Sequence, residues 1–182
     1  MKKSILIYGC IIGVILAINL VFMVNLLYNN PNMESNDVVG YAAMIIVFSL
    51  IFFGVRNYRN KQGEGFISFK EAFKMGAAIA FIAATMYVIS WVFYYYLFVP
   101  DFMDKYAEYV LSSSEKKGAT AATLAEQAKD MESFKHMYKN PLFVVLITYS
   151  EVLPVGLITA LISALILKKK TSNQPNGLIT NT

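Results

Sequence analysis

Glu151 is the one acidic or basic side chain that lies inside a long apolar stretch of this sequence. A carboxylate in a hydrocarbon environment costs about 3 kcal/mol on insertion scales. No lysine or arginine lies in any of the apolar stretches to pair with it. We therefore expect the carboxyl group to be protonated at neutral pH, or to be hydrogen-bonded by hydroxyl and amide groups. The chemistry that such a group offers is proton exchange, solute binding or a bond between helices.

Four more polar side chains are predicted to lie near the same depth, and together with Glu151 they form a candidate intramembrane polar layer. They are Asn19, Ser49, Ser90 and Tyr87. Counted from the outer ends of their stretches, Glu151 lies roughly 15 Å deep and the others within about one helical turn of that level. The layer is interpreted either as a titrating or substrate-binding site, or as a hydrogen-bonded clamp that fixes helix register. The clamp is favoured because no further acid or histidine provides a proton relay.

The elements that must position these side chains are four apolar stretches without lysine, arginine or aspartate. They cover residues 4–27, 38–55, 75–99 and 142–167. Each is long enough, at about 1.5 Å per residue, for a hydrocarbon core of about 30 Å. Of the 182 residues 57% are hydrophobic and only 15% are charged, with a single cysteine, which excludes a disordered chain and a disulfide-stapled module. The predicted fold class is all-α, an integral membrane bundle of four transmembrane helices.

The orientation of this bundle follows from the distribution of lysine and arginine. Both termini and the second connection carry ten basic residues, whereas the other side carries six, all in the long third connection together with seven acids. The positive-inside rule therefore predicts that both termini are cytoplasmic. The positive inner face suits an anionic lipid surface and needs no nucleic acid to explain it.

The second connection is predicted to be a tight helical hairpin. Gly63 is placed to end the second helix, and residues 64–67 form the turn. Ser68 and Glu71 have the spacing of a capping box, so the third helix should begin near Phe69.

The third connection, residues 100–140, is predicted to be a helical extracytoplasmic insertion between the third and fourth spans. Helical spacing of apolar residues after Pro100 suggests one helix, which residues 112–118 interrupt. A second capping box is predicted at Thr123 and Glu126. The following helix carries an apolar stripe, which consists of Leu124, Ala128, Met131, Phe134 and Tyr138. The insertion is expected to cap the bundle; lying on the bilayer and binding a partner are the alternatives. Residues 1–170 are predicted to form a single domain and 171–182 a disordered cytoplasmic tail.

Small residues four positions apart recur in three of the spans. The candidate helix-packing residues are Gly9, Gly13, Gly76, Ala80, Gly156 and Ala160. Such spacing places them on one helix face, where two helices approach closely. Three such faces favour a tight intramolecular bundle, and a homo-oligomer is the alternative.

Three segments resemble a known family. They are the run from Gly54 to Gly76, the tetrapeptide from Tyr138 to Pro141 and the segment from Glu151 to Leu157. Together they are similar to the bacterial membrane family named domain of unknown function 4199, and the likeness covers nearly the whole chain. The resemblance implies a small four-span protein of a Gram-negative inner membrane. It implies no activity and no catalytic residue.

No motif of a known enzyme class is found in the sequence. One cysteine and one histidine are too few for a zinc site, and neither a phosphate-binding glycine loop nor a nucleophile elbow is present. We therefore expect a non-enzymatic structural, assembly or accessory membrane module without a cofactor. Its expected partners are the lipid bilayer and either a second membrane protein or another copy of the chain. The alternative function is a small carrier or channel-like protein in which Glu151 titrates.

Overall fold

The protein is helical throughout the part of the chain that the computed structural model describes, residues 1–29 and 37–169. Within these ranges the chain forms no β-strand, and an isolated bridge pairs Ile67 with Lys169. The predicted tail at 171–182 lies outside the described residues.

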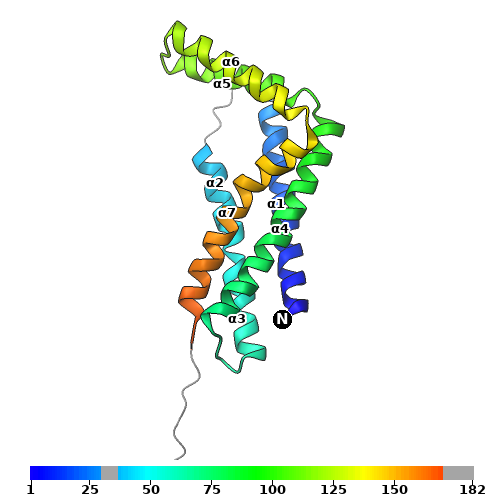
Figure 1. Ribbon diagram of the computed structural model, residues 1–182, viewed down its shortest axis with the longest axis vertical. Coiled ribbons are helices and arrows are strands. Elements are labelled where there is room, and N and C mark those ends of the chain that lie inside the picture. The colour runs from blue at the N-terminus through cyan, green and yellow to red at the C-terminus, as the bar shows by residue number, and fades with distance from the viewer. Residues whose placement is uncertain (30–36, 170–182) are drawn as a thin grey trace, which may run out of the picture.

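Four of the helical segments are long and apolar enough to cross a membrane, as the sequence predicted. The first is α1 (Lys2–Asn29). The second consists of α2 (Asp37–Phe48) and α3 (Leu50–Gln62), which meet at Ser49. The third and fourth are α4 (Phe69–Phe98) and α7 (Pro141–Leu167). Between them, α5 (Phe102–Lys116) and α6 (Ala121–Tyr138) lie side by side across one end of the spans, here called the cap end (Figure 1). The opposite end, with the α3–α4 turn, is the hairpin end.

Large apolar side chains cover the outside of the spans. Ile18, Phe93 and Ile158 are each more than half exposed, as are many of their neighbours on the same helices. In α5 and α6, by contrast, Met137 is the one exposed large apolar side chain. The perimeter of the spans therefore suits a lipid environment, whereas the two cap helices present a polar face to water.

Helix α4 is the central element, because it packs along α1 on one side and along α7 on another. The contact with α7 is closest where a glycine of one helix meets an alanine of the other. A Cβ atom added to Gly76 would lie 2.9 Å from the Cβ of Ala160, and one added to Gly156 would lie 2.8 Å from the Cβ of Ala80. In lipid, where hydrophobic burial between helices is weak, this dense packing supplies much of the attraction between helices.

The contact between α1 and α4 uses glycine in the same way. A Cβ added to Gly9 would lie 2.8 Å from the Cβ of Ile82, and one added to Gly13 would lie 2.7 Å from the sulfur of Met86. All six predicted helix-packing residues therefore lie in one of two helix–helix contacts, α1–α4 or α4–α7.

The hairpin end is fastened by hydrogen bonds. The predicted capping box is present: the Ser68 hydroxyl accepts from the N–H of Glu71, whose carboxylate accepts from the N–H of Ser68. As predicted, α3 ends at Gln62 and α4 begins at Phe69. Ile67 exchanges backbone hydrogen bonds of 3.1 and 2.9 Å with Lys169, which joins the turn to the end of α7.

Two local predictions for the cap helices are wrong. The N-cap of α6 is Thr120, whose hydroxyl accepts from the N–H of Thr123 at 3.3 Å, so the helix begins before the predicted capping box. Gly118, with φ of +81°, makes the turn that leaves Thr120 in this position. Helix α5 also continues through the serines to Lys116, and within it the Ser112 hydroxyl donates to the Tyr109 carbonyl at 3.1 Å.

We expect Gly156→Ala to lower the free energy of unfolding by about 1–3 kcal/mol, because overpacked contacts must spread apart. The added methyl group would lie 2.8 Å from the Ala80 Cβ and 3.0 Å from Phe48 Cε1. Gly40→Ala in α2 is the matched control, since nothing lies within 4 Å of its added Cβ. Denaturant titration in detergent micelles measures both variants. Wild-type stability of Gly156→Ala would show that the α4–α7 contact is not tight.

Candidate functional site

The side chain of Glu151 opens into a cavity instead of bonding to a neighbouring helix. The residue lies ten positions after the start of α7, or roughly 15 Å along the helix from the cap end. Its side chain is exposed, whereas the side chain of the next residue, Val152, is fully buried. Two adjoining cavities of about 280 and 400 Å³ share it as a lining residue. The cavities also share Leu20, Val24, Tyr87 and Tyr106, so they lie side by side and we describe them as two lobes of one cavity.

The cavity exists because the second span bends away from α4. On the hairpin side of Ser49, α3 packs against α1, α4 and α7. On the cap side of Ser49, α2 packs against α7 and α1 and has no comparable contact with α4. The larger lobe occupies the space left beside α2, with Gly40, Tyr41 and Met44 on one wall. The smaller lobe extends beneath α5 and α6.

Three of the five residues of the predicted polar layer line this cavity. Asn19, Tyr87 and Glu151 come from α1, α4 and α7 and face the larger lobe. Ser49 and Ser90 are not among the residues that line either lobe. The hydroxyl of Ser49 donates to the Ile46 carbonyl at 2.6 Å, beside the junction of α2 and α3.

Four further polar side chains line the cavity and were not predicted. They are Tyr41, Tyr106, Tyr138 and Thr148. Tyr106 and Tyr138 belong to the cap helices, so only the return of the insertion over the spans brings them to Glu151. The hydroxyl of Thr148 is already engaged, because it donates to the Val144 carbonyl at 2.7 Å.

The charge of an ionised Glu151 has no counterpart in this cavity. Neither lobe is lined by lysine, arginine or histidine among the described residues. Within the same part of the chain, the carboxyl group of Glu151 also makes no hydrogen bond or ion pair. A carboxylate without a partner is costly at this depth in a membrane-spanning helix, so the site favours either protonation or a cationic guest.

Aromatic rings close the cap end of the cavity. Phe102 of α5 lies edge-on to Trp91 of α4, with ring centroids 5.1 Å apart, and Tyr138 of α6 lies edge-on to Tyr95 at 5.5 Å. Burial, and then the nearby Glu151 carboxyl, raises the pKa of Tyr138 to about 12, so its hydroxyl is neutral. Trp91 and Tyr95 are buried under the cap.

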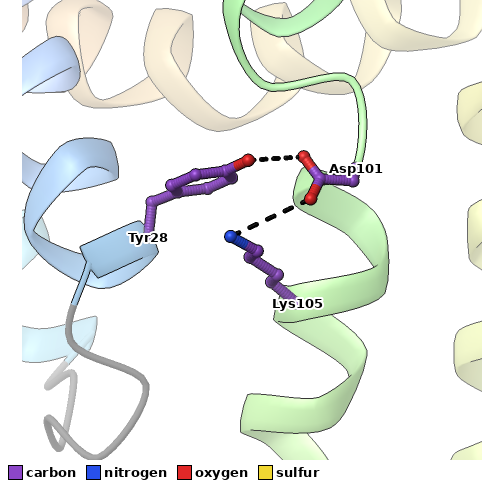
Figure 2. A network of polar contacts seen from close by, with 3 residues as sticks. All are labelled: Tyr28, Asp101 and Lys105. Atoms are coloured by element: carbon purple, nitrogen blue, oxygen red, sulfur yellow. Dashed lines mark hydrogen bonds and ion pairs between the residues drawn. The ribbon is translucent and has the colours of Figure 1, made fainter.

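Two ion pairs and a hydrogen bond hold the cap helices in place. Lys135 of α6 pairs with Asp104 of α5, which raises the pKa of Lys135. Figure 2 shows the second contact, in which the Tyr28 hydroxyl at the end of α1 donates to Asp101 at 2.7 Å. Lys105 lies 3.8 Å from the same carboxylate and 3.2 Å from the centroid of the Tyr28 ring. This tether joins the end of α1 to the start of α5, next to Tyr106.

The fold and the site together define a small helical protein with four candidate membrane-spanning helices and an acidic cavity beneath a helical cap. Residues 7–169 match the model of the family described as protein of unknown function DUF4199. The chain therefore belongs to this family, as the resemblance of its sequence indicated. No curated protein and no solved structure matches the chain.

The hydrogen bond from Tyr28 holds the pKa of the Asp101 carboxyl below its ordinary value, because it stabilises the ionised form. A carboxyl group whose pKa is lower in the folded than in the unfolded state stabilises the protein at pH values above its unfolded-state pKa. This stabilisation is lost as the pH falls through the folded-state pKa. We therefore expect the tether to be intact at neutral pH and to weaken below about pH 4.

Tyr28→Phe removes the hydroxyl and should raise the pKa of Asp101 towards its ordinary value. Carboxyl carbon NMR measures this pKa by titration, with Asp101→Asn to assign the signal. An unchanged pKa in Tyr28→Phe would show that the hydroxyl is not the cause.

Proposed function

We propose that this protein is a multi-pass protein of the bacterial inner membrane that binds a small solute in the Glu151 cavity. The observation that carries the proposal is a carboxyl group without a partner, open to a cavity about halfway along a membrane-spanning helix. On this proposal the four spans form a four-helix bundle, both termini are cytoplasmic, and α5 and α6 are extracytoplasmic.

The distribution of charge and of exposed apolar side chains supports the membrane assignment. Ten basic residues lie at the hairpin end and in the terminal segments, against six on the cap side. This bias favours a cytoplasmic hairpin end. The polar outer surface of α5 and α6 suits an aqueous compartment beyond the bilayer.

Solute binding accounts for Glu151 better than a structural clamp does. A clamp requires hydrogen bonds from Glu151 to a neighbouring helix, and the described residues supply none. A proton pathway requires further acids or histidines, and none lines the cavity within the described residues. The non-enzymatic role expected from the sequence stays a prediction.

The assembly role that the sequence favoured stays a prediction. One surface considered for a partner was the apolar stripe of α6, which was otherwise expected to cap the bundle. Phe134 and Tyr138, at one end of this stripe, line the cavity, and Leu124 and Met131 are partly buried. The stripe is therefore used largely within the protein itself.

Orientation is tested with single cysteines in a Cys10→Ala background, since Cys10 is the one native cysteine. We expect a membrane-impermeant thiol reagent to label Lys117→Cys, in the α5–α6 turn, in intact spheroplasts. Lys61→Cys, near the end of α3, should be labelled only after lysis. The reverse pattern would overturn the proposed orientation.

Access of water to the cavity is tested with Glu151→Cys in the same background. We expect this thiol to react with a water-soluble methanethiosulfonate at least tenfold faster than Ile158→Cys on the lipid-facing side of α7. Thiolate is the reactive species, and it forms in water but not in lipid. Val152→Cys, whose position is fully buried, is a second control. Equal rates at positions 151 and 158 would show that lipid fills the cavity and would overturn the proposed function.

A further inference from the structure

The chemistry of the cavity wall identifies the class of solute. Resting on the proposed function above, we propose that the ligand is a small organic cation whose ammonium group pairs with the Glu151 carboxylate against tyrosine rings. Glu151 supplies the one formal charge among the described residues that line the two lobes. A positive guest supplies the missing partner and keeps the carboxylate ionised at a depth where it is otherwise expensive.

Aromatic rings surround this carboxylate. Tyr41, Tyr87 and Tyr106 line the same lobe as Glu151 and come from three different helices. The face of an aromatic ring attracts a cation, and quaternary ammonium groups are bound in this way in aromatic cages. An anionic ligand is disfavoured by the same set, because a carboxylate repels it and no basic side chain offsets this repulsion among the described lining residues.

The protein already holds one ammonium group by the same combination of groups. At the cap end, the Lys105 ammonium lies 3.2 Å from the centroid of the Tyr28 ring and 3.8 Å from an Asp101 carboxylate oxygen (Figure 2). The Glu151 lobe offers the same two elements, a carboxylate and tyrosine rings, without a lysine of its own among the described lining residues.

The shape of the cavity describes the rest of the ligand. The lobe of about 400 Å³ carries the carboxylate, the three tyrosines and the amide of Asn19, which suits an ammonium head with a hydroxyl or amine substituent. The lobe of about 280 Å³ shares Glu151, Tyr87 and Tyr106 with the first and adds the rings of Trp91, Phe102 and Phe134, which suit an apolar extension of the ligand.

Trp91 is the one tryptophan of the chain and lines the cavity, so its fluorescence reports occupancy. The full-length protein in detergent micelles is titrated with choline and, separately, with 3,3-dimethyl-1-butanol, in which carbon replaces the ammonium nitrogen. We expect a saturable change with choline and at least tenfold weaker binding of the neutral alcohol. Equal binding of the two probes would overturn the cationic ligand.

Glu151→Gln should weaken choline binding at least tenfold, whereas Glu126→Gln, the same change on the exposed face of α6, should leave it unchanged. Tyr41→Leu should weaken it severalfold and Tyr41→Phe, which keeps the ring, should not. The Tyr41 pair keeps the test decisive if Glu151→Gln fails to fold. Unaltered choline affinity in both Glu151→Gln and Tyr41→Leu would overturn the proposal.

The failure of this inference is distinguishable from the failure of the proposed function. If choline has no effect, or binds no better than the alcohol, while Glu151→Cys reacts as a water-exposed thiol, the cationic ligand is overturned and solute binding stands. If choline has no effect and Glu151→Cys reacts no faster than Ile158→Cys, both proposals are overturned.

Discussion

The contact between α4 and α7 is the constraint on which the rest of the structure depends. Gly76 against Ala160 and Gly156 against Ala80 bring two helix backbones closer than any larger side chain permits. In lipid, such dense packing replaces the hydrophobic driving force that holds soluble cores together. Because this seam fixes α7 on α4, it also fixes the direction in which Glu151 leaves α7, into a cavity that Tyr87 of α4 lines as well.

The cavity contrasts with this tight contact between α4 and α7. Fully buried side chains such as Phe48, Ile51 and Ile79 fill the hairpin half of the spans. On the cap side of Ser49 the second span no longer packs along α4, and side chains from α2 do not fill the space between them. The cap helices cover the opening with aromatic rings, and the tether from Tyr28 to Asp101 holds them there. The cap half has a buried cluster of its own, with Trp91, Tyr95 and Val144 among its members, and the cavity lies beside this cluster.

The sequence predicted the elements well because their signals are local. Four apolar lengths and the capping box of Ser68 and Glu71 each depend on neighbouring residues, and the structure has them where they were expected. The start of α6 was misplaced because two threonines were available as N-caps, and the turn at Gly118 selects Thr120. The local sequence does not show which of the two threonines caps the helix.

The site was predictable only in part, for a related reason. Counting residues along each helix gives depth but not the direction in which a side chain points. Asn19, Ser49 and Ser90 were thus placed at the depth of Glu151, yet only Asn19 lines its cavity. Tyr41 and Tyr106 were missed because the bend of the second span and the return of α5 over the spans are tertiary features.

The backbone pair between Ile67 and Lys169 limits how the cavity can change its shape. It joins the end of α7 to the turn that precedes α4, so the two helices are clamped at the hairpin end as well as along their seam. Separating α4 from α7 at this end would therefore break two backbone hydrogen bonds in addition to opening the glycine–alanine contacts between the helices.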